Sequence, residues 1–137
     1  MIRYAEENDF PILREHDKQI SEAELRNSIE AKRVIVMFHQ NRLIGWLRFN
    51  LFWDKIPFMN MLYVLEGGRG KGYGRQMVDF WEKEMQKKPY RMVLTSTLSN
   101  ERAQFFYRKN GYVDCGSLLL PGEPLEIILL KNLDSEK

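Results

Sequence analysis

The clearest periodicity in the chain is a four-residue repeat of large side chains at Tyr73, Met77, Trp81 and Met85. Positions four residues apart share one face of an α-helix, whereas a strand would place apolar residues at every second position. The spacing therefore predicts an amphipathic helix over Tyr73–Lys87 with one apolar face.

Seven runs are rich in β-branched, aromatic and aliphatic residues and are typical of strands. They are Ile2–Ala5, Val34–Phe38, Leu43–Phe52, Phe58–Leu65, Met92–Thr97, Tyr112–Leu120 and Leu125–Leu130. The polar turn 40–42 predicts an antiparallel hairpin between the second and third runs. The loop Pro121–Pro124 predicts an antiparallel pair between the last two.

Capping signals predict three further helices. Asp9 and Pro11 open the first, and Ser21 with Glu24 forms a capping-box pair for a second that extends to about Ala31. Ser99 or Asn100 is the predicted N-cap of the third, which Gly111 ends as a left-handed cap.

The predicted order is β-α-α-β-β-β-α-β-α-β-β. The strand–helix–strand segment from Phe58 to Thr97 requires a parallel crossover, which is almost always right-handed, and the hairpins on either side make the sheet mixed. We therefore expect an α/β fold (α+β by stricter bookkeeping) with a mostly antiparallel sheet of about seven strands and four helices. The 137 residues suit a single domain, residues 1–137.

The composition is that of an ordinary globular protein, with 44% hydrophobic and 29% charged residues. Cys115 is the single cysteine, so an internal disulfide and a cysteine zinc site are excluded, and we expect no metal. Cys115 itself is predicted to be a small buried apolar residue. The chain shows no apolar run of the ~18 residues that a membrane span needs and no signal peptide, which predicts a cytoplasmic location without membrane contact.

The net charge of +2 is too small to indicate a nucleic-acid-binding protein, but the charge is unevenly distributed. Residues 1–31 contain four basic and eight acidic residues, and residues 67–109 contain ten basic and four acidic ones. The basic stretch is either a solvated helix face or a pocket for a small polyanion.

A glycine-rich segment, Gly67–Gly74, joins a predicted strand to the predicted helix at Tyr73. Glycines allow positive φ and close approach of a ligand, and the unpaired amides at a helix N-terminus favour phosphate. Arg69, Lys71 and Arg75 add charge, which suits a pyrophosphate. The spacing matches neither the P-loop nor the dinucleotide-binding fingerprint, so the alternative is a plain glycine-rich turn.

A second group of residues, Asn100, Ala103 and Tyr107, has the spacing i, i+3, i+7 of one helix face. An ordinary buried face would have Leu or Ile at these positions. The alternative is that Tyr107 simply packs beside Phe106.

The two segments together resemble the GNAT superfamily of acyl-CoA N-acyltransferases. Arg69–Gly74 reads Arg-Gly-Lys-Gly-Tyr-Gly and fits the family pattern Arg/Gln-x-x-Gly-x-Gly/Ala. Asn100, Ala103, Tyr107 and 110–112 resemble its second motif, Asn-x-x-Ala-x-x-x-Tyr-x-x-x-Gly-Phe/Tyr. The order of elements agrees over essentially the whole chain.

The resemblance implies that acetyl-CoA is the acyl donor and that no metal is needed. Its pyrophosphate would bind the loop amides, and its pantetheine arm would lie between the splayed strands Phe58–Leu65 and Met92–Thr97. The acyl-CoA-binding residues that the resemblance implies are Leu62, Tyr63, Val64, Arg69, Gly70, Lys71, Gly72, Tyr73, Gly74, Arg75, Asn100, Ala103 and Tyr107.

The resemblance also assigns catalytic roles. A backbone N–H near Val64 would stabilise the oxyanion, and Tyr107 would protonate the departing thiolate. Many relatives have a glutamate base on the strand before the glycine loop, but this strand lacks one. Asn60 could hold a relay water, and Asp54 could bind or deprotonate the acceptor, although turn formation is the alternative for Asp54.

The acceptor is expected to be an amine of a small molecule or a peptide, bound by a monomer or a homodimer. Trp53 with Asp54 could bind a cationic amine, and Glu123 could face the same cleft, while the alternative for Phe52 and Trp53 is core packing. Two other functions remain open: an acyl-CoA-binding or sensing domain without catalysis, and a plain interaction domain.

Overall fold

The computed structural model describes residues 1–134 and contains four α-helices and seven strands in the predicted order. The helices are α1 (Phe10–His16), α2 (Glu22–Glu30), α3 (Tyr73–Lys87) and α4 (Ala103–Lys109). The strands are β1 (Ile2–Tyr4), β2 (Val34–His39), β3 (Arg42–Phe52), β4 (Ile56–Val64), β5 (Met92–Leu98), β6 (Val113–Leu118) and β7 (Glu126–Asn132). Two 3-10 turns, η1 (Glu7–Asp9) and η2 (Glu66–Gly68), precede α1 and follow β4.

The strands form one mixed sheet in the order β1-β2-β3-β4-β5-β7-β6, with β4 and β5 parallel and the recorded pairs β1–β2, β2–β3, β5–β7 and β6–β7 antiparallel. The expected fold class is therefore confirmed. The chain divides into two compact units: unit 1 comprises residues 1–50 and 61–83, and unit 2 comprises residues 51–60 and 84–137.

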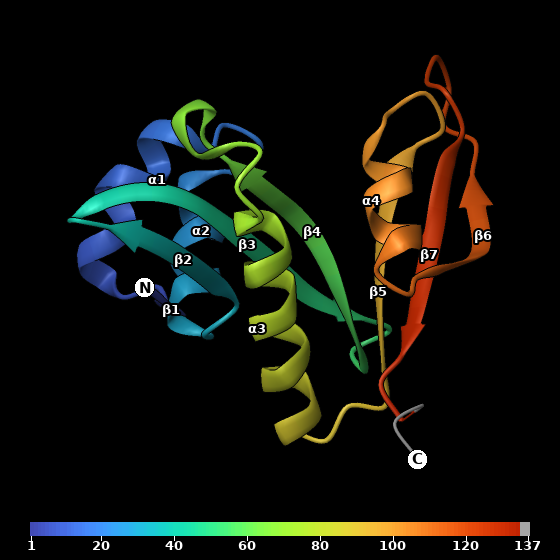
Figure 1. Ribbon diagram of the computed structural model, residues 1–137, viewed down its shortest axis with the longest axis horizontal. Helices are drawn as coiled ribbons and strands as arrows, with labels where there is room; N and C mark the ends of the chain where they lie inside the picture. The colour runs from blue at the N-terminus through green and yellow to red at the C-terminus, as the bar shows by residue number, and fades with distance from the viewer. Residues whose placement is uncertain (135–137) are drawn as a thin grey trace. The chain divides into compact units, whose positions relative to one another are not determined.

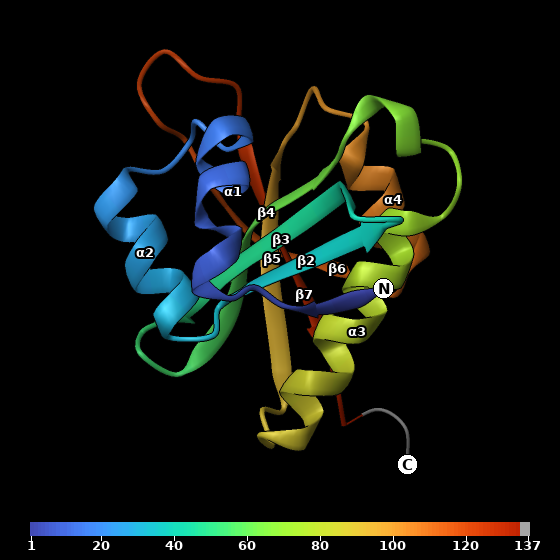
Figure 2. The ribbon, with the colours of Figure 1, turned by 90° about the vertical axis from the view of Figure 1, so that its left-hand side faces the viewer.

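Unit 1 packs helices on both faces of its strands (Figures 1 and 2). Alternate residues of a strand point to opposite faces. Val34, Val36 and Trp46 therefore join the α1 and α2 side chains in one apolar cluster. On the other face, the Phe49 ring lies 5.8 Å from that of Trp81 on α3.

A buried ion pair fixes the end of α1 to β3 within unit 1. The Asp17 carboxylate accepts hydrogen bonds from Arg48 Nε at 2.6 Å and from Trp46 Nε1 at 3.0 Å. Breaking a buried pair by removing one partner costs about 3–5 kcal/mol, because a charge is then left unpaired. Asp17 is thus a structural carboxylate.

Unit 2 is built on β5, which pairs with β7 and, through Phe58–Leu94 and Met59–Thr95, with the first half of β4. Strand β7 pairs in turn with β6. Helix α4 ends as predicted at Gly111, whose φ of +95° and N–H bond to Arg108 O complete a left-handed cap. Tyr112 N also bonds to Tyr107 O, so the cap orients the end of the helix that carries Tyr107.

Most predicted boundaries agree with the structure to within two or three residues, and Ser21 Oγ caps α2 as expected by accepting a hydrogen bond from Glu24 N. One boundary is wrong: α4 begins at Ala103, not near Ser99. The prediction for Cys115 is also wrong, because Cys115 lies exposed on β6, all of whose residues are exposed. Within residues 1–134, no helix is both long enough and apolar enough to cross a membrane.

Candidate active site

The glycine-rich segment leaves β4, makes the turn η2 and enters α3 at Tyr73. Gly70 and Gly72 have φ values of +79° and +80°, the left-handed region that favours glycine. A Cβ atom at either position would meet no atom within 4 Å, so the loop is open to a ligand. The first amides of α3 have no partner within the helix, and the helix dipole favours an anion there.

The Arg69 side chain lies against the end of β4. Its Nε donates to Val64 O at 2.9 Å and its Nη2 donates to Tyr63 Oη at 2.8 Å. Both partners were expected to bind acyl-CoA through main-chain groups. The Val64 carbonyl is therefore already paired, and two of the five N–H groups of the exposed Arg69 guanidinium are directed to β4.

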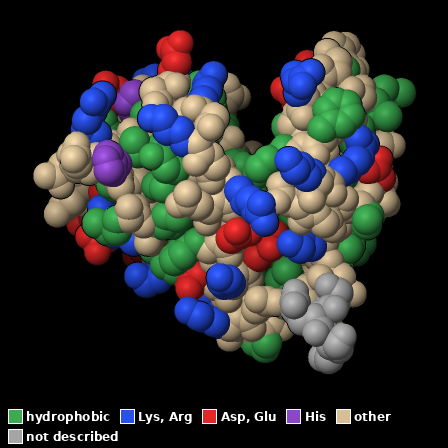
Figure 3. Space-filling model, viewed as in Figure 1, with side chains coloured by type: hydrophobic (Ala, Val, Ile, Leu, Met, Phe, Trp, Pro, Cys, Tyr) green, Lys and Arg blue, Asp and Glu red, His purple; other side chains and the backbone are tan. Residues whose placement is uncertain are grey.

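Two other cations remain near the start of α3. Lys71 is exposed on the loop, and Arg75 is exposed with its Nε 3.9 Å from the Asp79 carboxylate one turn later. Figure 3 shows basic and acidic side chains interspersed over α3. The body of α3 is thus an ordinary solvated face, and the loop itself is the part of the basic stretch in unit 1 that suits an anion.

Gly45 was not predicted as a site residue, although it lets β4 approach β3 closely. A Cβ atom at Gly45 would collide with the Tyr63 carbonyl oxygen and lie 2.9 Å from Met77 Cε. Glycine inside a strand is the sequence signal for such an approach. Gly45 therefore determines where the main chain of Tyr63 and Val64 runs.

Tyr107 lies on α4 with only 7% of its surface exposed. Its ring contacts Phe106 and Tyr112, with centroids 5.2 and 5.6 Å away. Burial raises the pKa of the phenol to about 12, partly offset by a hydrogen bond with the Thr95 side chain, while the charge of Glu101 raises it slightly further. The group is a protonated phenol at any physiological pH.

The residues before α4 differ from the prediction. The Glu101 carboxylate accepts from Leu98 N at 3.1 Å and from Thr97 Oγ1 at 3.2 Å, which holds the segment in a turn until Ala103. Asn100 lies in that turn, so only Ala103 and Tyr107 share a face of α4. Asn100 and Ala103 are both exposed.

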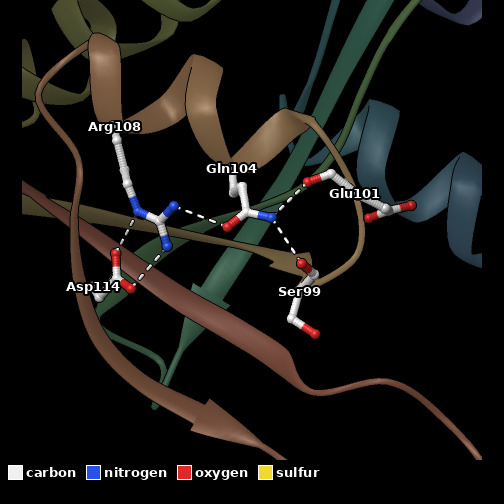
Figure 4. A network of polar contacts seen from close by, with 5 residues as sticks. All are labelled: Ser99, Glu101, Gln104, Arg108 and Asp114. Atoms are coloured by element: carbon white, nitrogen blue, oxygen red, sulfur yellow. Dashed lines mark hydrogen bonds and ion pairs between the residues drawn. The ribbon is translucent and has the colours of Figure 1, made fainter.

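A polar network continues along α4 (Figure 4). Gln104 Nε2 donates to the carbonyl oxygens of Ser99 and Glu101, each at 2.8 Å. Gln104 Oε1 accepts from Arg108, whose guanidinium also holds both oxygens of Asp114 at 2.9 Å. The network ties the turn before α4 to the start of β6.

Trp53 and Asp54 form the turn between β3 and β4. Their φ values are +57° and +62°, and Lys55 N bonds to Phe52 O, which is a two-residue hairpin turn of type I′. Trp53 is 73% exposed, so the core-packing alternative is wrong for it. Asp54 is exposed as well, so the partial desolvation expected of a base is not found.

The remaining candidates are Asn60, exposed on β4, and Glu123, exposed in the loop between β6 and β7. Leu120 O and Glu123 N close that loop in a turn with Gly122 at φ +75°. Neither side chain makes a hydrogen bond or ion pair recorded among residues 1–134. No group of three His, Cys, Asp or Glu residues in the same range is arranged to hold a metal ion.

The site residues fall into both units of the chain. Unit 1 holds the second half of β4, the glycine loop and the start of α3. Unit 2 holds Tyr107 and its surroundings, together with the turn at Asp54, the exposed Asn60 and the loop at Glu123.

The glycine loop at the start of α3 and the α4 cap after Tyr107 agree with a known family. The sequence model of the acetyltransferase (GNAT) family matches residues 1–112. The chain belongs to the GNAT acetyltransferase family. No curated protein sequence matches it.

Several solved structures have the same fold. Ard1 from Thermoplasma volcanium superimposes with a TM-score of 0.82 at 14% identity, covering 96% of each chain. PaiA N-acetyltransferase from Thermoplasma acidophilum, determined with coenzyme A, gives 0.79 at 20% identity over 96% of this chain and 98% of its own. A GNAT acetyltransferase from Bacillus cereus gives 0.78 at 21% identity over 96% of each chain. At these identities the likeness establishes the fold alone.

Proposed function

We propose that this GNAT protein transfers the acetyl group of acetyl-CoA directly to an amine in a ternary complex. The observation that carries the proposal is the loop before α3, in which Gly70 and Gly72 have positive φ values and open space where a side chain would lie. Family membership makes acyl-CoA the ligand expected on such a loop.

In the proposed complex, the CoA pyrophosphate accepts hydrogen bonds from the amides of residues 70–75, and Lys71 and Arg75 supply cationic charge. The open space around Gly70 and Gly72 fits this ligand. A pantetheine amide that pairs with Val64 O would first have to displace Arg69 Nε, which occupies that carbonyl.

The reaction forms a C–N bond and breaks the C–S bond. The neutral amine attacks the thioester carbon, a backbone N–H near Val64 stabilises the oxyanion, and collapse of the intermediate sends the electron pair to sulfur. The amine proton leaves to solvent, through a water that the exposed amide of Asn60 holds. This relay needs no carboxylate base, which suits the absence of a glutamate on β4.

Tyr107 is proposed to donate a hydrogen bond to the departing thiolate. A phenol of pKa about 12 keeps its proton more firmly than a thiol, whose reference pKa is about 8.5. The proton is therefore shared with sulfur as the C–S bond breaks and remains mainly on the phenol. We therefore propose that Tyr107 acts by donating a hydrogen bond to sulfur, with proton transfer by general acid catalysis as the alternative.

Tyr107→Phe tests this role because it removes the hydroxyl and keeps the ring. We expect kcat to fall about a hundredfold, the typical cost of one donor to a developing charge, with the Kd for acetyl-CoA nearly unchanged. Isothermal titration calorimetry gives the Kd, and thiol release gives kcat. A kcat within a few-fold of wild type excludes Tyr107 from the reaction.

The acceptor class is proposed to be a primary amine of a small molecule or a peptide. A screen of diamines, amino sugars and peptide N-termini for acetyl-CoA-dependent thiol release tests activity and acceptor class together. The second candidate function is an acyl-CoA-binding domain without catalysis, in which the loop functions and Tyr107 does not. Binding of acetyl-CoA without turnover of any acceptor would support it.

A further inference from the structure

A small cavity lies within unit 1, at the end of α1 and beside the second half of β4. Its volume is about 290 Å³. Pockets for drug-sized molecules measure about 300–1,000 Å³, so this cavity is of the size that holds a single ring or one side chain. The residues that line it are His16, Asp17, Lys18, Gln19, Trp46, Met61, Tyr63 and Leu65.

Three rings stand next to one another along the cavity. The Trp46 ring centroid lies 5.1 Å from that of Tyr63 and 6.3 Å from that of His16, within the range of ring–ring contact. Trp46 is 2% exposed, whereas Tyr63 is 40% exposed and keeps ring surface for a ligand. Met61 and Leu65 lie on the same face of β4 as Tyr63, because alternate strand residues share a face. The wall is therefore mainly aromatic and apolar.

The carboxylate in the lining is that of Asp17, and its hydrogen-bonding capacity is already used. Oδ1 accepts from Gln19 N at 3.2 Å and from Arg48 Nη2 at 3.4 Å, while Oδ2 accepts from Arg48 Nε at 2.6 Å and from Trp46 Nε1 at 3.0 Å. A carboxylate has about four acceptor sites, so Asp17 has none left for an ammonium group. Arg48 balances its charge and Lys18 adds a positive one, which makes the cavity unfavourable for a cation.

The cavity lies beside the main-chain group that is proposed to stabilise the oxyanion. Leu65 N donates to Ile44 O on β3 at 2.8 Å. Neighbouring N–H groups of a strand point to opposite edges, so the Val64 N–H points away from β3. The side chains before and after Val64, Tyr63 and Leu65, both line the cavity. Because strand residues repeat about every 3.3 Å, a link of two or three atoms spans from a ring in the cavity to an amine beside Val64.

We propose that this cavity binds an uncharged aromatic side group of the acceptor and thereby holds its amine beside Val64. The acceptor class is then an amine with an aromatic ring two or three bonds away, either an arylalkylamine or a peptide with an aromatic first residue. This rests on the proposed function, because it identifies the acceptor of the same acetyl transfer.

The first test measures binding without acetyl-CoA. The probe is 2-phenylethanol, which has the ring and the two-carbon link but no amine. We expect it to shift the ¹H–¹⁵N resonance of Trp46 Nε1 saturably in the wild-type protein. Absence of a saturable shift overturns the proposal.

Gln19→Trp closes the cavity from its exposed edge, since Gln19 is exposed and the bond to Asp17 uses only its backbone N–H. The Kd for 2-phenylethanol should rise at least tenfold, because the added ring takes the place of the ligand ring. Gln86→Trp is the matched control, with the same substitution at an exposed glutamine of α3 that does not line the cavity. Its Kd should stay within two-fold of wild type, and thermal unfolding shows that both variants fold.

The second test compares acceptors by their kcat/KM for acetyl-CoA-dependent thiol release. We expect 2-phenylethylamine to exceed ethylamine at least tenfold and 1,4-diaminobutane to show no such gain. Gln19→Trp should abolish the advantage of the aromatic amine, and Gln86→Trp should retain it. The peptide Phe-Ala-Ala is measured beside 2-phenylethylamine, and the higher kcat/KM of the two identifies the source of the aromatic group.

The outcomes separate this proposal from the proposed function. Equal kcat/KM values for 2-phenylethylamine and ethylamine, or a higher value for 1,4-diaminobutane, overturn the aromatic acceptor while acetyl transfer stands. If 2-phenylethanol binds and Gln19→Trp abolishes its binding, but no acceptor is acetylated, it is the proposed function that fails and not the assignment of the cavity.

Discussion

Because the phenol of Tyr107 is buried, its ionisation changes the free energy of unfolding. The folded-state pKa of about 12 exceeds the value of 10.0 for an exposed tyrosine. A raised pKa means that folding favours the protonated phenol, so the stabilisation is complete below pH 10 and is lost as the pH rises towards 12. The same burial makes the phenol a poor proton donor.

We expect Tyr107→Phe to flatten the alkaline decline in stability. Wild type should lose about 1 kcal/mol more than the variant between pH 9 and pH 11, since only the unfolded tyrosine ionises in that range. Urea unfolding at pH 9, 10 and 11 measures this difference, and the other tyrosines and the lysines cancel between the two proteins. Parallel pH profiles would show that Tyr107 ionises like an exposed tyrosine.

The sequence indicated Tyr107 but not Thr95, a buried residue of β5. Tyr107 belongs to a spacing that the family pattern makes visible, whereas a single threonine inside a strand has no local signature. Thr95 and Met59 are 36 positions apart, and they meet because β4 and β5 are parallel neighbours. Pairings of this kind depend on strand register, which local patterns do not determine.

In the glycine loop, glycine is required for its backbone conformation and not because a side chain would lack space. Gly67 and Gly72 both leave room for a side chain, but only Gly72 has a positive φ. We expect Gly72→Ala to weaken acetyl-CoA binding at least tenfold, because the strained φ of a non-glycine residue shifts the amides of the loop. Calorimetric Kd values would measure the effect.

Gly67→Ala is the matched control for this loop. It adds the same methyl group five positions earlier without demanding a left-handed conformation, and its Kd should stay within two-fold of wild type. Equal losses in both variants would mean that added bulk, rather than φ, disrupts binding. If both variants keep the wild-type Kd for acetyl-CoA, the loop amides do not belong to the binding site.

Local patterns predicted α3 to the residue and misplaced the start of α4. The four-residue repeat of α3 coincides with a buried face that includes Met77, Trp81 and Met85. Before α4, the Glu101 carboxylate accepts from the Leu98 amide and the Thr97 hydroxyl, and the segment stays in a turn up to Ala103. Helix propensity alone does not determine at which of these residues α4 begins.

The sequence left two roles open for Asp54: formation of a turn, and binding or deprotonation of the acceptor. Variants of Asp54 distinguish them. Asp54 adopts φ +62°, a conformation that costs a non-glycine residue about 1 kcal/mol. We expect Asp54→Gly to raise the free energy of unfolding by up to about that amount and Asp54→Asn to leave it unchanged. Denaturant titration measures the stabilities, and both variants should keep the wild-type kcat and acceptor KM. A raised acceptor KM in both would instead support the acceptor role.

Across the whole molecule, charge is nearly balanced, with 21 basic and 19 acidic residues. A molecule of net charge +2 exerts little long-range attraction on an anionic ligand. Any electrostatic contribution to CoA binding must therefore come from cations close to the phosphates. Arg69 and Lys71 are both exposed, but Arg69 is hydrogen-bonded to Tyr63 and Val64, which makes Lys71 the better cation to test.

Added salt should therefore weaken acetyl-CoA binding, in part through Lys71. The Debye length falls from about 10 Å at 0.1 M salt to about 3 Å at 1 M, which screens an exposed lysine from a phosphate. We expect the wild-type Kd to rise several-fold over this range. The Kd of Lys71→Gln should be higher than that of wild type at 0.1 M salt and rise less with added salt, because only Arg75 then supplies charge to the phosphates. Lys32→Gln, an exposed lysine in the turn after α2, is the control and should keep the wild-type salt dependence. If Lys71→Gln retains the full salt dependence, Lys71 does not lie near the phosphates, and its proposed role in the loop is wrong.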